Sequence, residues 1–266
     1  MDAALTAQHR GGAGSPLVLV HGFTDTWRSW ELVLPALQAR HDVLAVTLPG
    51  HAGGAPLPAS LTDDTMAQGV ERAMDEAGFD LAHIVGNSLG GYTALRLAAR
   101  GRARTVVALA PAGGWAAGDD ADHETLRQFT ITRQLVQAAL PHADAIAASS
   151  EGRRRATELI TTSFEHIPAE LIAHQIRGAA GCDGAPALID YALTHAWSLD
   201  AERVTCPVRV VWGTADRLLP WPRAAVRYRE SWLPNADWVI LDDVGHCPQL
   251  DVPIVTAQLI LGFTAG

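Results

Sequence analysis

A serine in a glycine-rich turn is the strongest candidate for chemistry in this sequence. The segment Gly86-Asn87-Ser88-Leu89-Gly90 follows a run of apolar residues typical of a strand and precedes a helical period. A serine between glycines at a strand-to-helix turn is held in a strained backbone that presents its Oγ for nucleophilic attack. In the simpler alternative, the hydroxyl of Ser88 only caps the helix that follows.

A nucleophilic serine needs a base, and the base needs a carboxylate that orients it. Asp216 follows one apolar run and His246 follows the next. Because the carboxyl ends of parallel strands meet at one edge of a sheet, the order Ser88, Asp216, His246 predicts a catalytic triad. Asp216 is the preferred acid because it lies in a tight turn directly at a strand end. Four other carboxylates compete for the role: Asp119, Asp120, Asp242 and Asp243.

Acyl transfer by a serine also needs donors for the oxyanion. The backbone N–H of Leu89, at the start of the helix after Ser88, is one expected donor, since the helix dipole favours negative charge there. The N–H of Phe23, in the loop after an earlier strand, is the other. The neighbouring His21 is interpreted as structural, with its ring bonded to the loop backbone.

The elements that must position these residues alternate between apolar strands and helical periods, which predicts an α/β fold. Continuous apolar strands indicate a mostly parallel central sheet with helices on both faces. The expected strands are Pro16–Val20, Asp42–Thr47, Leu81–Gly86, Thr105–Ala110, Pro207–Gly213 and Trp238–Asp243. The expected helices of this part are Arg28–Ala39, Thr62–Gly78, Leu89–Arg100, Arg223–Trp232 and one that starts at Val252.

Between the fourth and fifth expected strands, the alternation stops. Residues 111–203, which we call the insert, show helical periods but no convincing strand, and they are too many for a loop. The sequence therefore predicts a core of residues 1–110 and 204–266, with residues 111–203 as a helical lid before the last strands. The expected lid helices are Glu124–Leu140, Arg153–Phe164, Ala169–Ala180 and Ala185–His195. Candidates for an apolar pocket in the insert are Trp115, Phe129, Ile131, Leu135, Phe164, Ile172 and Trp197. We expect most of them to form the core of the lid and a minority to touch substrate.

Composition excludes several classes of function. The chain of 266 residues is 48% hydrophobic, enough for a sizeable core, and its net charge of −9 disfavours nucleic acid and anionic membrane partners. It contains no lysine, which excludes Schiff-base, P-loop and lysine-base chemistry. The three widely spaced cysteines, Cys182, Cys206 and Cys247, suit neither a disulfide framework nor a metal pair. Without a visible signal peptide, the expected location is cytoplasmic, and the oligomeric state stays open.

Several motifs in order, HGF at 21–23, LPGH at 48–51, GNSLGG at 86–91, GTADRLLP at 213–220 and VGHCPQLDVP at 244–253, resemble the α/β-hydrolase superfamily. The resemblance implies Ser88 as nucleophile, Asp216 as acid, His246 as base, and Phe23 and Leu89 as backbone donors to the oxyanion. It implies no metal and no cofactor. The serine at the nucleophile position disfavours haloalkane dehalogenases and epoxide hydrolases, which use an aspartate there.

Within that superfamily, a serine hydrolase that cleaves carboxylic esters of small, mainly apolar molecules is the preferred hypothesis. The asparagine before Ser88 resembles C–C hydrolases of meta-cleavage products, but those often carry tryptophan where this chain has Cys247. Lactonases, thioesterases and cofactor-free perhydrolases share the same machinery. A ligand receptor built on the hydrolase fold is the non-enzymatic alternative.

Overall fold

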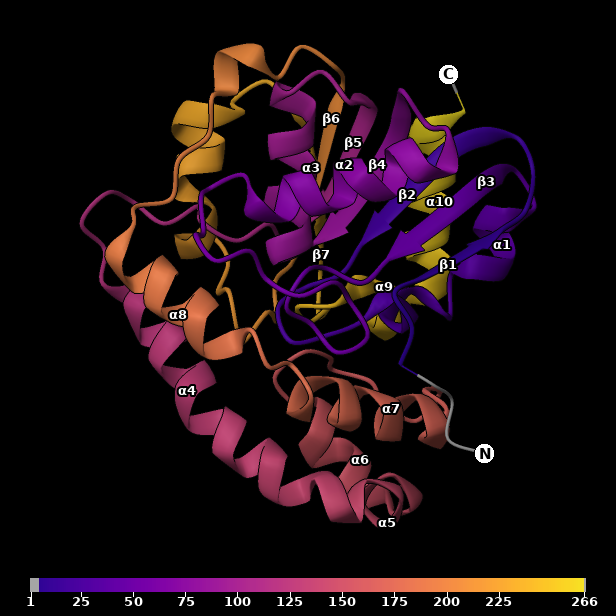
Figure 1. The fold of residues 1–266 in the computed structure, drawn as a ribbon, viewed down its shortest axis with the longest axis vertical. Coiled ribbons are helices and arrows are strands. Elements are labelled where there is room, and N and C mark those ends of the chain that lie inside the picture. Colours follow the sequence, from indigo (N-terminus) through magenta and orange to yellow (C-terminus); the bar gives the residue numbers. More distant parts are fainter. Residues whose placement is uncertain (1–4, 266) are drawn as a thin grey trace.

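A seven-stranded sheet forms the centre of the computed structural model, which describes residues 5–265 (Figure 1). The strands lie in the order β1-β3-β2-β4-β5-β6-β7, and all neighbours are parallel except the antiparallel pair β1 and β3. Their bounds are β1 Gln8–Gly11, β2 Ser15–Val20, β3 His41–Val46, β4 Ala82–Asn87, β5 Ala103–Leu109, β6 Val208–Gly213 and β7 Asp237–Leu241. The predicted α/β class with a mostly parallel sheet is confirmed. Residues 1–4 and 266 of the predicted core lie outside the described residues.

Helices cover both faces of this sheet because each strand sends alternate side chains to opposite sides. Val18 and Val20 of β2 join one apolar cluster with residues of α2 and α3. Leu17 and Leu19 join a second cluster with residues of α1 and α10. The bounds are α1 Leu34–Gln38, α2 Thr65–Ala77, α3 Leu89–Ala99, α9 Pro248–Asp251 and α10 Pro253–Thr264.

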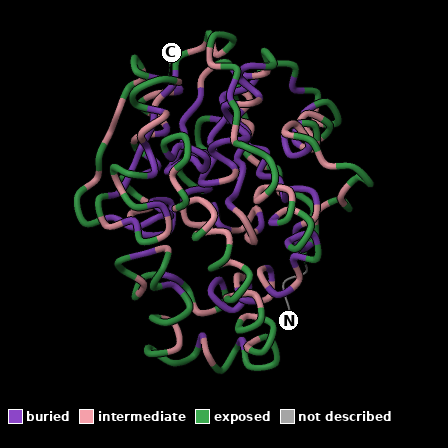
Figure 2. Tube along the Cα trace, turned by 90° about the vertical axis from the view of Figure 1, so that its left-hand side faces the viewer, coloured by how far each residue is buried: buried purple, intermediate pink, exposed green. Residues whose placement is uncertain are grey.

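The helices of the insert gather at one end of the molecule, beyond the carboxyl ends of the strands (Figure 1). They are α4 Ala121–Ala139, α5 Ala143–Ala148, α6 Ser150–Thr157, α7 Ala169–Ala180 and α8 Ala185–Thr194. This end is far more exposed than the sheet (Figure 2), and α4 holds no fully buried residue. Ile131 and Leu135 on α4 are 62% and 67% exposed, so the expectation that they pack in the core of the lid or line a pocket is wrong.

Some elements differ from those expected. The edge strand β1 was not predicted because its residues are polar and show no apolar run; it pairs with the backbone of β3. The expected helix Arg28–Ala39 is a 3₁₀ turn at Trp27–Trp30 followed by α1, whose first turn contains Pro35, a residue that cannot donate to a preceding helical turn. Among the described residues, no helix is long and apolar enough to cross a membrane.

The expected helix Arg223–Trp232 is also interrupted. A 3₁₀ turn covers Arg223–Ala225 and a π turn covers Tyr228–Trp232. Between the two turns, the N–H of Arg227 donates to the carbonyl of Gly114 at 2.8 Å. This bond to a distant loop takes the place of a helical one, so the regular α-helix is not formed.

Candidate active site

Ser88 lies at a sharp turn between the end of β4 and the start of α3. Its backbone has φ 55° and ψ −119°, a conformation that residues with a side chain rarely adopt. A Cβ added to Gly86 would lie 2.0 Å from the carbonyl oxygen of Gly90, and one added to Gly90 would lie 2.1 Å from that of Val20. The two glycines are therefore required for the turn to close, and the turn holds Ser88 in a strained conformation.

His246 and Asp216 form a buried pair. The Nδ1 of His246 lies 2.8 Å from Oδ2 of Asp216, and the two residues are 2% and 4% exposed. The other carboxylate oxygen of Asp216 accepts the N–H groups of Leu218 at 2.9 Å and Leu219 at 2.7 Å. Asp216 therefore has both oxygens fixed and can hold the imidazole with its proton on Nδ1. Among the described residues, Nε2 of His246 has no hydrogen-bond partner.

The competing carboxylates lie elsewhere. Asp242 and Asp243 are exposed, and so is Asp120 at the start of α4. Asp119 forms an ion pair with Arg223 at 2.6 Å. Of the five carboxylates considered from the sequence, Asp216 is the one that contacts His246.

Asn87, the residue before Ser88, fastens the loop of His246 to the turn. Its side-chain N–H groups donate to the carbonyls of Leu109 at 3.1 Å and His246 at 3.0 Å. Its oxygen accepts from the thiol of Cys247 at 3.2 Å and from the amide of Gln249 at 3.1 Å. Burial raises the pKa of the Cys247 thiol well above its usual range, so this thiol stays protonated and donates. Three of these contacts join residues 246–249 to Asn87, so the loop of His246 lies beside the residue that precedes Ser88.

The loop after β2 passes close to Ser88. A Cβ added to Gly22 would lie 3.2 Å from Cβ of Ser88, and Phe23, Ser88 and Leu89 line one pocket. His21 has the structural role predicted for it: Nδ1 bonds the carbonyl of Gly22 at 2.6 Å and Nε2 accepts the N–H of Leu48 at 2.9 Å. Burial lowers the pKa of His21 well below its usual value, which keeps the ring neutral.

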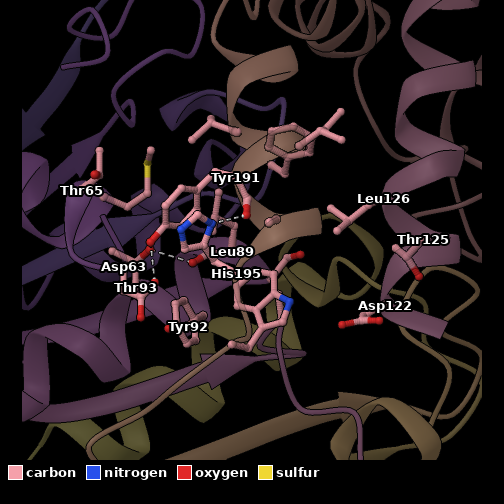
Figure 3. A pocket seen from close by; sticks show the side chains of 18 of the residues that line it. Asp63, Thr65, Leu89, Tyr92, Thr93, Asp122, Thr125, Leu126, Tyr191 and His195 are labelled. Carbon is pink, nitrogen blue, oxygen red and sulfur yellow. Dashed lines mark hydrogen bonds between the residues drawn. The ribbon is translucent and has the colours of Figure 1, made fainter. Parts of the chain in front are cut away.

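The pocket beside Ser88 has about 1050 Å³ of empty space when the part open to solvent is included. Most of its wall is apolar, and it comes from the core and from α4 and α8 of the insert (Figure 3). Three of the predicted pocket residues line it: Trp115, Phe129 and Trp197. Phe164 and Ile172 instead pack with α5 and α7 in a separate cluster, as expected for the candidates that belong to the core of the lid.

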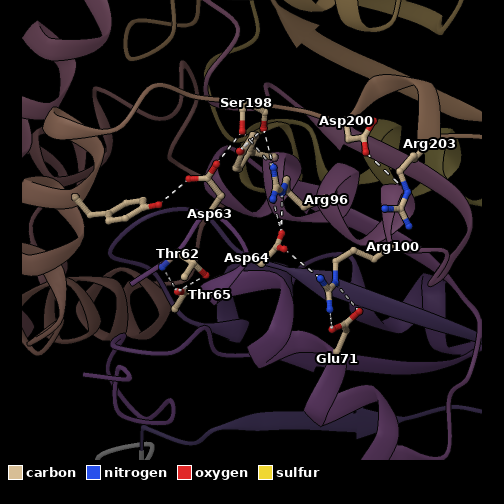
Figure 4. A network of polar contacts seen from close by, with 12 residues as sticks. Thr62, Asp63, Asp64, Thr65, Glu71, Arg96, Arg100, Ser198, Asp200 and Arg203 are labelled. Carbon is tan, nitrogen blue, oxygen red and sulfur yellow. Dashed lines mark hydrogen bonds and ion pairs between the residues drawn. The ribbon is translucent and has the colours of Figure 1, made fainter. Parts of the chain in front are cut away.

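Polar side chains at one end of the pocket bond to one another (Figures 3 and 4). Arg96 donates to Asp64 and to the carbonyl of Ser198, while Asp63 accepts from the hydroxyls of Tyr191 and Ser198, both at 2.7 Å. Burial alone would raise the pKa of Asp63, but these hydrogen bonds outweigh it, and the pKa is lowered. This network could not be predicted from the sequence, because its members are far apart in the chain and match no motif.

The sequence matches the family model described as the alpha/beta hydrolase fold over residues 15–253. The chain therefore belongs to the α/β-hydrolase fold family, as the motifs of the sequence indicate. The structure of a bacterial membrane phospholipase A, described as a novel virulence factor, superimposes with a TM-score of 0.75 at 22% identity. That alignment covers 100% of this chain and 86% of the other.

Two curated relatives show how varied the similar proteins are. "Epoxide hydrolase EphH" of Mycobacterium tuberculosis is 31% identical over 203 residues, which cover 76% of this chain and 95% of the relative. "Pimeloyl-[acyl-carrier protein] methyl ester esterase" of Neisseria meningitidis is 28% identical over 266 residues, covering 93% of each. The family is thus established, whereas the bond that is cleaved differs among its similar members.

Proposed function

We propose that this protein is a serine hydrolase that cleaves uncharged carboxylic esters through an acyl-enzyme. The observation that carries the proposal is a strained Ser88 in the wall of an apolar pocket, together with the buried His246–Asp216 pair, whose loop is bonded to Asn87, the residue before Ser88. Nucleophile, base and orienting carboxylate in this chain order are what acyl transfer on this fold requires.

In the proposed reaction, Ser88 Oγ attacks the ester carbonyl carbon while Nε2 of His246 accepts the hydroxyl proton. Asp216 holds Nδ1–H and stabilises the imidazolium. The N–H groups of Phe23 and Leu89 stabilise the oxyanion. The C–O bond then breaks, and the imidazolium returns the proton to the leaving alcohol. Water deprotonated by His246 attacks the acyl-enzyme and releases the acid together with free Ser88.

Charges in the pocket favour a neutral substrate. Of the described residues that line it, Arg96 is the only arginine, and its guanidinium is already paired with Asp64 and Ser198. The carboxylates of Asp63 and Asp122 also line the pocket. A substrate carboxylate would therefore lose hydration without gaining a free cation. This disfavours the C–C hydrolase alternative, since meta-cleavage products carry a carboxylate.

The nucleophile itself disfavours epoxide hydrolysis, although one relative is named for it. If Ser88 opened an epoxide, the product on the enzyme would be an alkyl ether. Such an ether has no carbonyl for water to attack, so the enzyme would not turn over. An ester, a lactone or a thioester gives an acyl-enzyme that water can hydrolyse.

The test compares wild type and Ser88→Ala on p-nitrophenyl esters, styrene oxide and a meta-cleavage dienoate. We expect ester hydrolysis, with a loss in kcat of about 10⁴-fold or more for Ser88→Ala. Thr125→Ala removes another hydroxyl that lines the pocket, and we expect it to change kcat by less than about threefold. Dienoate or epoxide turnover without ester turnover would refute the proposal. Stoichiometric labelling of Ser88 by a fluorophosphonate without turnover would favour the receptor alternative.

A further inference from the structure

The buried carboxylate of Asp251 takes no part in the chemistry described above, although it lies next to the loop of the base. Asp251 is the last residue of α9 and is 3% exposed. It accepts the N–H of Gly245 at 2.6 Å, the N–H of Ser163 at 2.8 Å and the N–H of Thr162 at 3.0 Å. A carboxylate this deeply buried is stabilised only by such charge-assisted bonds, so its partners are fixed.

The three N–H groups come from two distant parts of the chain. Gly245 directly precedes His246, whereas Thr162 and Ser163 belong to the insert, in the connection between α6 and α7. The Thr162 hydroxyl is within 3.2 Å of both Asp251 oxygens and lies 2.8 Å from the carbonyl of Asp243. Asp251 thus ties the loop of His246 to the insert.

Two more contacts extend this junction, formed by Asp251 between the loop of His246 and the insert, to the loop of Asp216. The N–H of Cys247 donates to the carbonyl of Ile160 at 2.8 Å. The guanidinium of Arg217, the residue after Asp216, donates to the carbonyl of Glu158 at 3.0 Å. Residues 158–163 therefore touch both the loop of the base and the loop of the acid.

We infer that Asp251 is a positioning residue for His246, and that residues 158–163 of the insert support the acid–base pair as Ser88 reacts. The inference rests on the proposed function, since it assigns His246 as the base. According to this inference, the insert does more than line the pocket. The part between α6 and α7 is a fixed support for the catalytic loops, whereas α4 and α8 supply the wall.

The arrangement requires a carboxylate and not an amide. Oδ2 faces the N–H of Gly245, Oδ1 faces the N–H of Ser163, and the N–H of Thr162 lies 3.0 to 3.1 Å from both. In Asp251→Asn, the new NH₂ group must face one of these donors. The volume of the side chain is nearly unchanged, so the variant breaks one side of the junction without opening a cavity.

The experiment measures kcat, KM and Tm with p-nitrophenyl butyrate for wild type, Asp251→Asn and Asp251→Glu. Asp243→Asn is the control, because that exposed carboxylate lies in the same loop. We expect Asp251→Asn to lower kcat by about 10²-fold with KM within about twofold, since a small displacement of a base acts on the chemical step. Asp251→Glu should recover part of the loss, and the control should stay within about threefold of wild type.

A spectroscopic measurement separates this inference from the proposed function. The downfield proton resonance of His246 Nδ1–H, bonded to Asp216, should broaden or vanish in Asp251→Asn and persist in Asp243→Asn. The signal needs no substrate, so it tests the positioning role even if wild type hydrolyses no ester, which would refute the proposed function alone. An unchanged resonance and an unchanged kcat, with a lower Tm only, would overturn the inference.

If Asp251→Asn does not fold, Thr162→Val provides the test. Thr162 is exposed, and the variant removes its hydroxyl while keeping the backbone N–H groups. We expect kcat to fall by about tenfold, more than in the control, and Tm to fall only slightly, as for the loss of one hydrogen bond to a charged group. A wild-type kcat in Thr162→Val would overturn the inference.

Discussion

Trp197 offers a sharp test of how the insert shapes substrate choice. Its indole lines the pocket and meets the ring of Tyr92 edge-on, with centroids 4.9 Å apart. It also covers Gly113, where an added Cβ would lie 2.7 Å from the indole. Trp197→Ala would therefore open new space next to the wall of the pocket, and it would also remove packing.

The size of the effect follows from burial of the acyl chain. Each buried CH₂ stabilises the bound state by about 0.8 kcal/mol, so two methylenes that enter the new space would shift relative kcat/KM by roughly tenfold. The loss of packing acts on every substrate alike. A fully buried tryptophan replaced by alanine costs about 3–5 kcal/mol of stability, and half-buried Trp197 should cost less.

The assay is a p-nitrophenyl ester series from acetate to octanoate, with Tm measured for each variant. Trp232→Ala is the matched control, because Trp232 is also half-buried against the core but does not line the pocket. We expect Trp197→Ala to favour the longer esters and Trp232→Ala to leave the order of preference unchanged. A parallel drop across the series in both variants would refute the role of Trp197 as a pocket wall.

Three further predictions concern the acid of the triad, the carboxylate of Asp25 and the absence of a metal from the mechanism. Asp216→Asn should lower kcat by several orders of magnitude, because the amide stabilises the wrong tautomer of His246. Asp242→Asn should lower kcat by less than about tenfold. The reverse ranking of the two variants in steady-state kinetics would assign the acid of the triad to Asp242. Burial raises the pKa of Asp25 from 3.8 to about 6, so its contribution to stability is full below about pH 4 and is lost as the pH rises through 6. Asp25→Asn should accordingly raise the free energy of unfolding at pH 8 by up to about 3 kcal/mol and leave it unchanged near pH 4, and urea denaturation that shows equal shifts at both pH values would contradict this. Chelators should leave kcat unchanged, because the proposed mechanism uses no metal ion, and a loss in EDTA that zinc restores would count against it.

The strands that position the site could be predicted because they are continuous apolar runs that end in turn residues. Asp216 and His246 lie just beyond β6 and β7, and Ser88 directly follows β4, so parallel pairing of the sheet places all three at one end. The pattern of the residues is sufficient here because the sheet fixes the relative positions of its strand ends.

The contacts made by the insert could not be predicted in the same way. Ile131 and Leu135 follow a helical period, but α4 exposes them, and the period does not say which face meets the core. Asp251 lies within a motif recognised from the sequence. Its partners Thr162 and Ser163 are brought to it only by tertiary packing, so nothing local to either segment signals the contact.

The most direct test of the central claim is to trap the acyl-enzyme. Wild type is mixed with p-nitrophenyl acetate, quenched in acid within the first turnover and analysed by peptide mass spectrometry. The account predicts one acetyl group on the peptide that contains Ser88, and none in Ser88→Ala. Rapid release of p-nitrophenol with Ser88 unmodified throughout, or with the acetyl group on another residue, would contradict it.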